Sequence, residues 1–399
     1  MKVFQINSFY NGSTGKISRS ICEILKKSGN KYFFAYGMGR SDDPNSLSLS
    51  SWFESRLHDQ LSKLTGMQGY FSIFRTIELV HKLKEENPDI IHLHNLHGNY
   101  LCLPILFRYL KNSRAKIVVT MHDCWWFTGK CAHFTFVKCE RWKTGCGHCP
   151  QWNGYPKSYF FDRSRKCLDD KKKWLASIGT RLTIITPSKW LADLVQQSFL
   201  KDYPVNVINN GIDLKIFKPT PSNFREKYGI SKDRYILTGV SFWWGDKKGL
   251  DIFIELAKRL DERFKIVLVG TNDKVDRQLP ESIVSIHRTN NQAELAEIYT
   301  AADLFVNPTR EDNFPTTNIE ALACGTPVVT FKTGGSPECI DETCGSVVDC
   351  GDLSALKDEI IRICETHPYS DTACQARAKK FDAKDRFEEY LNVYLKLMG

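Results

Sequence analysis

Three acidic side chains stand close together in the second half of the sequence, next to a predicted strand and a short predicted helix. Glu311 and Asp312 follow the strand 304–306, and Glu320 begins a helical stretch that ends at Gly325. In open parallel sheets, ligands bind at the carboxyl ends of the strands. A carboxylate accepts hydrogen bonds from two neighbouring hydroxyl groups at once, which suits a ribose or a hexose. The alternative is a solvated acidic loop that caps the helix.

A glycine-rich loop follows the first predicted strand, residues 2–6. Its sequence is Asn-Gly-Ser-Thr-Gly-Lys over residues 11–16, and a helical stretch, 17–28, comes next. Glycines such as Gly12 and Gly15 let a backbone approach a phosphate closely, and a helix N-terminus adds N–H donors and positive partial charge. The P-loop motif fits poorly, because it needs four residues between its glycines and Ser or Thr after its lysine. An anion-binding loop and a plain tight turn both fit.

The segment 124–159 is rich in Cys, Trp, Phe, Gly and Pro, which indicates an insertion with its own organisation. Four of its cysteines are Cys131, Cys139, Cys146 and Cys149, and the last two have the Cys-x2-Cys spacing of a zinc knuckle. A zinc ion held by four thiolates would be structural, because no coordination position stays open. Free thiols and disulfides are the alternatives.

Aromatic and imidazole side chains form two further candidate groups. The insertion tryptophans either stack on sugar rings or form the insertion's own core, and they are Trp125, Trp126, Trp142 and Trp152. His92 and His94 share one face of the predicted strand 90–94, because side chains alternate along a strand. Together with His97 they have a spacing that suits either a metal ion or contact with a substrate.

Length and composition indicate a globular protein of two domains. The chain has 399 residues, of which 42% are apolar and 25% charged. We expect no membrane span, since no stretch holds about 18 uninterrupted apolar residues, and no signal peptide. The 14 cysteines are then expected to be thiols or metal ligands in a reducing cytosol. The net charge of +9 favours anionic lipid surfaces or phosphorylated substrates, whereas no nucleic-acid-binding module is recognised.

Short apolar runs alternate with helical patterns along most of the chain, which predicts an α/β fold of doubly wound parallel sheets. The predicted strands are 2–6, 32–36, 90–94, 116–120, 182–186, 205–208, 236–240, 265–269, 283–286, 304–306 and 328–330. The clearest helical stretches are 17–28, 250–261, 292–301 and 383–398. A Pro/Asn/Gly-rich stretch, 209–222, indicates the connection between the two domains.

In their order along the chain, these motifs resemble glycosyltransferase family 4, a group of retaining enzymes with the GT-B fold of two Rossmann-like domains facing across a cleft. After the glycine loop, the resemblance rests on segments 88–94 (PDIIHLH), 120–123 (TMHD), 186–191 (TPSKWL), 207–213 (VINNGID), 248–251 (KGLD), 269–270 (VG), 311–320 and 334–338 (GGSPE). Each segment alone is weak evidence, whereas the ordered set is specific. The chain looks most like enzymes that assemble bacterial capsular, exopolysaccharide or O-antigen (lipopolysaccharide) saccharides.

The resemblance implies a donor-binding role for matched residues of the second domain. Lys248 would hold the diphosphate of a nucleotide-sugar donor, and Glu320 would bind the ribose hydroxyls. The family's two acids are separated by seven intervening residues, which selects Asp312 as the first acid and leaves Glu311 as the alternative. The first acid and the backbone that follows it would grip the transferred sugar, and these backbone positions are Asn313, Phe314, Pro315 and Thr316.

The resemblance also implies roles for the first domain. His122 would lie beside the transferred sugar, and the backbone at Gly12 and Gly15 would face the diphosphate. His92, His94 and His97 would lie on the acceptor side. We count His122, Lys248, Asp312 and Glu320 as the predicted catalytic residues.

Two features of the sequence bear on how the leaving group is stabilised. The family's arginine after a glycine is absent, because Val240 and Ser241 follow Gly239, and Lys247 is its candidate substitute. The chain also contains no Asp-x-Asp pair of the kind that holds a metal in many such enzymes. Lys247, Lys248 and helix-terminal N–H groups would then stabilise the departing diphosphate without a catalytic metal.

These inferences combine into one expected architecture and function. Residues 1–205 form an acceptor-binding domain, 206–380 a donor-binding domain, and 381–399 a helix that returns to the first domain. The expected activity is transfer of a hexose-type sugar to a lipid-linked saccharide at the inner face of the cytoplasmic membrane, to which the enzyme binds peripherally. A sugar-nucleotide epimerase and a catalytically inactive saccharide- or nucleotide-binding protein are the alternatives.

Overall fold

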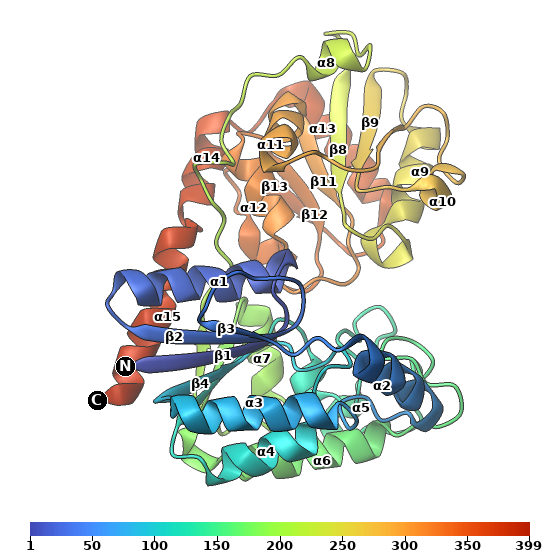
Figure 1. Ribbon diagram of the computed structural model, residues 1–399. Coiled ribbons are helices and arrows are strands. Elements are labelled where there is room, and N and C mark those ends of the chain that lie inside the picture. The colour runs from blue at the N-terminus through green and yellow to red at the C-terminus, as the bar shows by residue number, and fades with distance from the viewer. The chain divides into compact units, whose positions relative to one another are not determined.

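The computed structural model describes all 399 residues, and the chain divides into two compact units (Figure 1). Unit 1 contains Met1–Asn209 together with Phe387–Gly399, and unit 2 contains Asn210–Arg386. The chain leaves unit 1 at the first residue of the Pro/Asn/Gly-rich stretch 209–222. Each unit is built around one parallel sheet, so the predicted α/β class is confirmed.

Unit 1 contains a seven-stranded sheet in the order β3-β2-β1-β4-β5-β6-β7, and all of its neighbouring strands are parallel. The strand order reverses between β1 and β4, which makes the gap between their carboxyl ends the switch point of the sheet. The strands are β1 (Lys2–Phe9), β2 (Lys31–Met38), β3 (Ser46–Ser48), β4 (Ile90–Leu93), β5 (Lys116–Thr120), β6 (Leu182–Thr186) and β7 (Val205–Val207).

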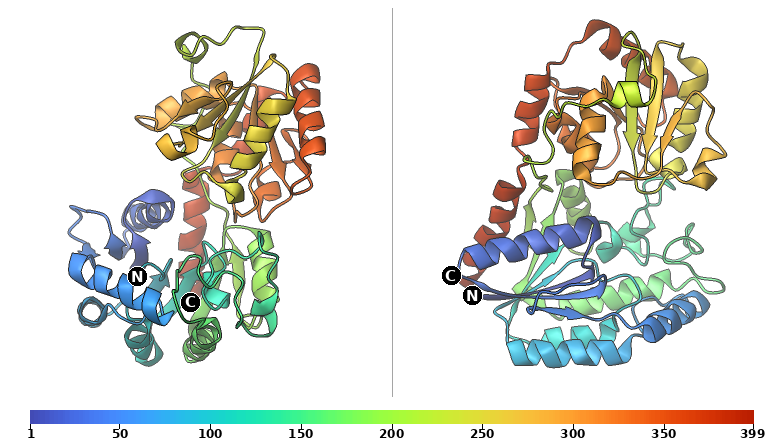
Figure 2. Two further views of the ribbon diagram at one scale, coloured as in Figure 1. Left: turned by 90° about the vertical axis from the view of Figure 1, so that its right-hand side faces the viewer. Right: turned by 45° about the horizontal axis from the view of Figure 1, so that its top comes forward.

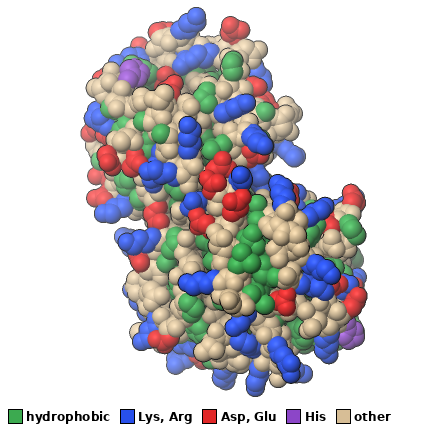
Figure 3. All heavy atoms as spheres, turned by 90° about the vertical axis from the view of Figure 1, so that its left-hand side faces the viewer, with side chains coloured by type: hydrophobic (Ala, Val, Ile, Leu, Met, Phe, Trp, Pro, Cys, Tyr) green, Lys and Arg blue, Asp and Glu red, His purple; other side chains and the backbone are tan.

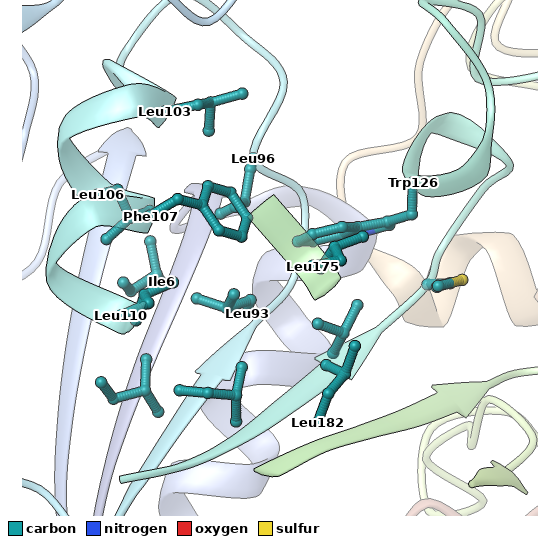
Figure 4. Close-up of a cluster of buried hydrophobic side chains, with 14 of the residues drawn as sticks. Ile6, Leu93, Leu96, Leu103, Leu106, Phe107, Leu110, Trp126, Leu175 and Leu182 are labelled. Atoms are coloured by element: carbon teal, nitrogen blue, oxygen red, sulfur yellow. The ribbon is translucent and has the colours of Figure 1, made fainter. Parts of the chain in front are cut away.

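Helices cover both faces of this sheet, with α1 on one face and α3, α4 and α6 on the other (Figures 1 and 2). Apolar side chains of the second face form the main core of the unit, in which Ile6 and Leu93 of the strands meet Leu106 and Leu110 of α4 (Figure 4). The longer helices of unit 1 within residues 1–209 are α1 (Gly12–Lys27), α2 (Trp52–Thr65), α3 (Ile73–Glu86), α4 (Leu103–Asn112), α6 (Ser164–Ala176) and α7 (Lys189–Gln196).

The last helix of the chain, α15 (Ala383–Met398), joins unit 1 from residue 387 onward. Tyr390 and Tyr394 of α15 are fully buried, and the Tyr394 hydroxyl lies 2.6 Å from Nδ1 of His92 on β4. A helix from the end of the sequence therefore completes the packing of a sheet formed near its beginning.

Unit 2 contains a six-stranded parallel sheet in the order β10-β9-β8-β11-β12-β13, with its switch point between β8 and β11. Its strands are β8 (Tyr235–Val240), β9 (Phe264–Val269), β10 (Val284–Ile286), β11 (Leu304–Asn307), β12 (Val328–Phe331) and β13 (Gly345–Val348). One face packs on α9 (Leu250–Arg259) and α13 (Leu353–Thr366). The other face packs on α11 (Gln292–Ala301), α12 (Thr316–Ala323) and α14 (Asp371–Lys379).

The predicted insertion contains only short helical turns, namely η1 (Trp125–Phe127) and α5 (Arg141–Thr144), within irregular chain. Trp125, Trp126 and Trp142 are buried and belong to the main core cluster of unit 1. The structure therefore favours the packing role that we considered for these tryptophans, because their rings are not available for stacking on a sugar.

The structure contains a strand at each of the predicted positions and two that we did not predict, β3 and β13. β3 is three residues long at the sheet edge, and β13 begins at a glycine, so neither shows a clear apolar run. Two helix starts were predicted too late. The helix α1 begins at Gly12, so the glycine loop forms its first turn, and α12 begins at Thr316, so Glu320 lies inside the helix instead of at its start.

The surface shown in Figure 3 carries Lys and Arg side chains interspersed with acidic ones, instead of one continuous basic area. None of the helices has both the length and the apolar character that crossing a membrane requires.

Candidate functional site

The predicted donor-side residues meet at the switch point of the unit 2 sheet. Lys247 and Lys248 lie in the short helix η3 (Asp246–Lys248), which follows β8, and Glu311 and Asp312 lie in the loop that follows β11. Because β8 and β11 are neighbouring parallel strands, their carboxyl ends lie at the same edge of the sheet. Residues that are more than sixty positions apart in sequence are therefore brought into direct contact.

Two lysine–carboxylate pairs join these loops. The Lys247 ammonium lies 2.6 Å from the Glu311 carboxylate, and the Lys248 ammonium lies 2.5 Å from the Asp312 carboxylate. Lys248 also donates a hydrogen bond of 3.1 Å to the backbone carbonyl of Glu311. The Glu311 side chain is only 4% exposed, whereas that of Asp312 is 22% exposed. Asp312 is thus the more accessible acid, although both acids face a lysine.

Arg310 holds the two loops together, and sequence reasoning did not identify it. Its guanidinium binds both carboxylate oxygens of Asp251 in α9 at 2.7 Å, and its backbone N–H donates to the Lys247 carbonyl at 2.8 Å. A bidentate guanidinium–carboxylate pair fixes orientation as well as distance. The sequence contains only two signals for this contact: Arg310 stands directly before the acidic pair, and Asp251 supplies a carboxylate in the first turn of α9.

Glycines let these two loops and the loop that follows β12 pack backbone to backbone. Gly334 has φ +57°, and a Cβ atom there would lie 1.8 Å from the Asp312 carbonyl oxygen. Gly249 has φ +75°, and its Cβ would lie 2.5 Å from the Pro308 carbonyl oxygen. Only glycine fits such positions, because a side chain would push the acidic loop away from its neighbours.

The residues after Asp312 form the turn into α12. Asn313 and Phe314 are buried, and the Phe314 ring packs against Phe381 at 5.6 Å between ring centroids. Pro315 is the N-cap residue of α12, and Thr316 is its first helical residue. The N–H groups of the first turn of α12 therefore follow directly on the acidic pair, where they add positive partial charge.

Glu320 lies in the middle of α12 and is half-buried. Its carboxylate accepts a hydrogen bond of 3.2 Å from the hydroxyl of Tyr299 in α11. Burial, with Glu320 beside it, raises the pKa of Tyr299 well above its usual range, so the hydroxyl stays a donor. This contact fixes one carboxylate oxygen in place.

Two exposed aromatic side chains stand in the same loop as the lysines. Phe242 and Trp243 follow β8 and are 88% and 75% exposed, with their ring centroids 5.9 Å apart. Largely exposed aromatic side chains beside a charged site are a signal for ligand contact that the sequence analysis missed.

The glycine loop lies at the switch point of the unit 1 sheet, at the carboxyl end of β1. A Cβ atom at Gly15 would lie 2.3 Å from the Tyr10 carbonyl oxygen, so this glycine is required by the packing of the helix on its own loop. Gly12 has φ +80° and open space around it. Of the two predicted glycines, Gly12 is therefore the one whose surroundings leave room for a ligand.

Two of the predicted histidines, His94 and His122, are hydrogen-bonded to each other, and His94 is also bonded to Gln5 of β1. His94 Nε2 lies 2.9 Å from the Gln5 side-chain oxygen, and His94 Nδ1 lies 3.0 Å from His122 Nε2. The amide nitrogen of Gln5 donates elsewhere, to Ser18 and Cys22, so its oxygen is the acceptor for His94. The network thus assigns a proton to His94 Nε2 and a second one to His122 Nε2.

Burial lowers the pKa of His92, His94 and His122. Desolvation holds the pKa of His92 and His94 well below their usual range, and it lowers that of the half-buried His122 to about 4. Each imidazole is therefore neutral near pH 7. His92 is fully buried, with one ring nitrogen on Tyr394 and the other on Thr120, so its position does not support the predicted acceptor-side contact or a metal-ligand role.

His97 belongs to a separate contact, with Asp123 and the insertion. Its Nε2 lies 2.9 Å from the Asp123 carboxylate, and its Nδ1 lies 3.0 Å from the hydroxyl of Tyr155. Burial acts to raise the pKa of Asp123, but the charge and hydrogen bond of His97 outweigh it and hold the pKa at about 2. Tyr155 is 58% exposed, so this part of the insertion stays open to a ligand.

The four spaced cysteines of the insertion are brought together. Cys131, Cys139, Cys146 and Cys149 line one small cavity, and none of them forms a disulfide. No three of their sulfur atoms lie within 4.8 Å of one another. Burial raises the pKa of Cys131 to about 12 and that of Cys146 to about 11, so without a cation these groups are neutral thiols.

Two family models match the chain. A glycosyltransferase family 4 domain matches residues 57–216, and a group 1 glycosyl transferase domain matches residues 233–366. Among curated proteins, WcaC of Escherichia coli K12, which carries the name of a colanic acid biosynthesis glycosyl transferase, is 27% identical over 82% of this chain and 79% of its own length. An Escherichia coli α-1,3-galactosyltransferase that acts on a GlcNAc-diphosphoundecaprenol is 22% identical over 60% of this chain and 67% of its own length.

Solved structures share the fold over the full chain. Sucrose-phosphate synthase of Thermosynechococcus elongatus superposes with a TM-score of 0.72 at 17% identity, covering 100% of this chain and 99% of its own. HepE of Anabaena, solved with UDP, superposes with a TM-score of 0.68 at 16% identity, covering 99% of this chain and 100% of its own. WaaG, a lipopolysaccharide glycosyltransferase, gives 0.64 at 16% identity, with 98% and 99% coverage. The predicted GT-B fold is confirmed.

The buried histidines predict that the protein loses stability in mild acid. Unfolding returns His92, His94, His122 and also His58, whose pKa burial lowers to about 4, to their usual pKa of about 6.5. The unfolded state then binds more protons below about pH 6.5, so the free energy of unfolding falls as the pH falls, by up to about 1.4 kcal/mol per pH unit for each group. Urea unfolding at pH 7.5, 6.5 and 5.5 measures this slope.

The variant His122→Gln isolates one of these groups. We expect it to reduce the slope between pH 6.5 and 5.5 by up to about 1.4 kcal/mol per pH unit. The variant His81→Gln, at an exposed position of α3, serves as the matched control and should leave the slope unchanged. An unchanged slope in His122→Gln would show that His122 is not held neutral by the fold.

Proposed function

The chain belongs to glycosyltransferase family 4 and carries the two glycosyltransferase domains whose models it matches, and we propose its function on this premise. Its activity in our proposal is the transfer of a hexose-type sugar from a nucleotide-diphosphate sugar to a saccharide acceptor, with retention of configuration at the transferred carbon. Unit 2 binds the donor, and unit 1 binds the acceptor.

The observation that carries this proposal is the double lysine–carboxylate pairing at the switch point of unit 2. Before a donor binds, Lys248 is neutralised by Asp312, and Lys247 by Glu311. A diphosphate attracts the ammonium groups, while sugar hydroxyls donate to the carboxylates. A nucleotide sugar offers both groups in one molecule, so it can replace each ion pair with two new contacts.

The reaction breaks the bond between the sugar carbon and the diphosphate, and negative charge grows on the leaving phosphate. Lys248 is positioned to stabilise this charge, with Lys247 beside it and the N–H groups of the first turn of α12 nearby. In our proposal these groups act without a catalytic metal. Glu320, with one carboxylate oxygen fixed by Tyr299, binds the ribose hydroxyls of the nucleotide.

Unit 1 contributes neutral hydrogen-bonding groups. His122 donates to His94 through Nε2, and the fold keeps both rings neutral at pH 7. We assign His122 to the transferred sugar, because a neutral imidazole contacts hydroxyl groups without attracting the diphosphate. Gly12 is assigned to the diphosphate, and His97 with Tyr155 to the acceptor.

The acceptor class is inferred from the relatives. The names of the matched Escherichia coli proteins refer to colanic acid and to a diphosphoundecaprenol-linked sugar. We therefore infer that this chain extends a lipid-linked saccharide during synthesis of a bacterial surface polysaccharide, on the cytoplasmic side of the membrane.

An exposed aromatic and basic surface on unit 1 supports peripheral attachment to a membrane. Trp52 and Phe53 of α2 are 73% and 69% exposed, and Phe74 of α3 is 76% exposed. The two helices are joined here, since the Phe74 N–H donates to Glu54 at 2.9 Å. The Arg56 guanidinium lies over the Trp52 ring. Exposed aromatic side chains with an arginine beside them suit the interface of an anionic bilayer.

Nucleotide binding provides the first test of the proposed function. We expect one nucleotide diphosphate, or its sugar conjugate, to raise the melting temperature, because a ligand at 100 times its Kd adds about 2.7 kcal/mol of stability. The variant Glu320→Ala should lose most of this shift. Asp358→Ala, an exposed acid of α13, is the matched control. If no nucleotide or nucleotide sugar shifts the wild-type protein, unit 2 has no working donor site.

Turnover tests the role of Lys248. Loss of one preorganised donor to a developing charge costs roughly 2.7–4 kcal/mol, so we expect Lys248→Ala to lower kcat about 100-fold or more. Lys258→Ala, in α9 on an exposed ion pair with Glu255, should leave kcat within about twofold. Product analysis in the same assay separates transfer to an acceptor from epimerisation of the donor. A Lys248→Ala variant with wild-type kcat would remove Lys248 from the mechanism.

Vesicle sedimentation tests the membrane proposal. We expect the double variant Trp52→Ser/Phe53→Ser to weaken binding to anionic vesicles at least about tenfold, because ~1.4 kcal/mol of lost apolar burial is tenfold. Phe242→Ser/Trp243→Ser removes a Phe and a Trp of unit 2 that are at least as exposed and is the matched control. Binding that is indifferent to lipid charge, to salt and to the α2 substitutions would contradict peripheral attachment through this surface.

A further inference from the structure

We propose that Cys131, Cys139, Cys146 and Cys149 form a structural zinc centre that holds the insertion of unit 1 in its fold. The four side chains line a single small cavity of the insertion. This inference goes beyond the proposed function and does not depend on it.

The four cysteines can reach a tetrahedral arrangement by local movement. All four lie outside helices and strands, so their backbone is not fixed by regular hydrogen bonding. Zinc–sulfur bonds of about 2.3 Å would bring the sulfur atoms to about 3.8 Å from one another. No three of the sulfur atoms lie within 4.8 Å of one another, so metal binding would draw the loops together around one ion.

Buried lysines supply the first independent argument. Lys130 and Lys171 are buried and form no ion pair with a carboxylate. Their hydrogen bonds go to neutral backbone carbonyls, that of Trp152 for Lys130 and those of Trp125 and Thr128 for Lys171, so neither buried charge is neutralised by an opposite charge, which is costly. Lys171 is close enough to interact electrostatically with Cys167 and, within the cluster, with Cys146 and Cys131, and Lys130 with Cys149, Asp162 and Cys131. One Zn²⁺ with four thiolates carries a net charge of −2, which two ammonium groups neutralise.

Hydrogen-bond donors supply the second argument. The backbone N–H of Gly129 donates to the Cys146 sulfur at 3.2 Å, and a thiolate is a far better acceptor than a thiol. Trp142 lines the same cavity, and its indole N–H is buried without a hydrogen-bond partner. Buried donors without an acceptor are rare in native proteins. Metal-bound thiolate sulfur in this cavity provides acceptors of the kind that is missing.

The centre would stabilise the insertion and take no part in the chemistry, because four thiolates leave no open coordination position. The insertion places Tyr155 at 3.0 Å from His97, and Lys171 donates to the carbonyls of Trp125 and Thr128. Zinc would therefore keep Tyr155 in contact with the His97–Asp123 pair, instead of binding substrate itself.

Metal analysis of the full-length protein tests this proposal. We expect about one zinc per chain in the wild-type protein, and much less in Cys146→Ser and in Cys149→Ser. Cys350→Ser is the matched control, because Cys350 is an exposed cysteine of unit 2 outside the cluster, and it should keep its zinc. Replacement of zinc by Co²⁺ should give the intense thiolate-to-metal charge-transfer bands of a tetrahedral thiolate site in the wild type and the control.

The wild-type protein alone can overturn the inference, whether or not the variants fold. A zinc content below about 0.2 per chain with no cobalt charge-transfer bands would do so. So would mapping of the four cysteines as two disulfides after purification without reductant. Nucleotide-induced stabilisation through unit 2 reports on the proposed function separately, since the cysteines all lie in unit 1.

Discussion

The rest of the donor-side architecture depends on the close approach of two loops at the carboxyl edge of the unit 2 sheet. Parallel neighbouring strands bring the loops to the same edge, but glycine is what lets them touch, as Gly249 does against the Pro308 carbonyl. The clamp of Arg310 on Asp251 then fixes their orientation. Lys248 can face a carboxylate only within this frame. The charged site therefore depends first on backbone packing, which sets where the loops lie, and only then on the ion pairs between their side chains.

The switch points of the two sheets differ in the charge of the side chains around them. At the switch point of unit 2, full charges stand in pairs and remain partly open to water, as the 33% exposure of the Lys248 side chain shows. Near the switch point of unit 1, His94 and His122 are kept neutral by burial and bonded to each other. Two Rossmann-like units of the same topology thus have a charged group of side chains at one switch point and a neutral group at the other.

Local signals in the sequence were sufficient for most elements and for the family. Apolar runs and turn residues located the strands, and ordered motifs located Lys248 and the acidic pair. What sequence could not show were contacts between distant segments. The partner of Arg310 lies 59 residues away, and the partner of His92, Tyr394, lies 302 residues away. Strand alternation placed His92 and His94 on one face correctly, yet only α15 decides that this face is covered. The start of α12 was also missed, because Pro315 caps the helix and sequence periodicity alone pointed to a later residue.

The return of α15 to unit 1 has a consequence for how the chain matures during synthesis. Unit 2 is continuous in sequence, whereas unit 1 needs its final thirteen residues, 387–399, to cover His92 and its neighbours. Domains usually complete their folding in the order in which the ribosome produces them. Here the order is inverted. The first unit to be translated must wait, with one face of its sheet incompletely covered, until the last helix has left the ribosomal tunnel, while the second unit can already be finished.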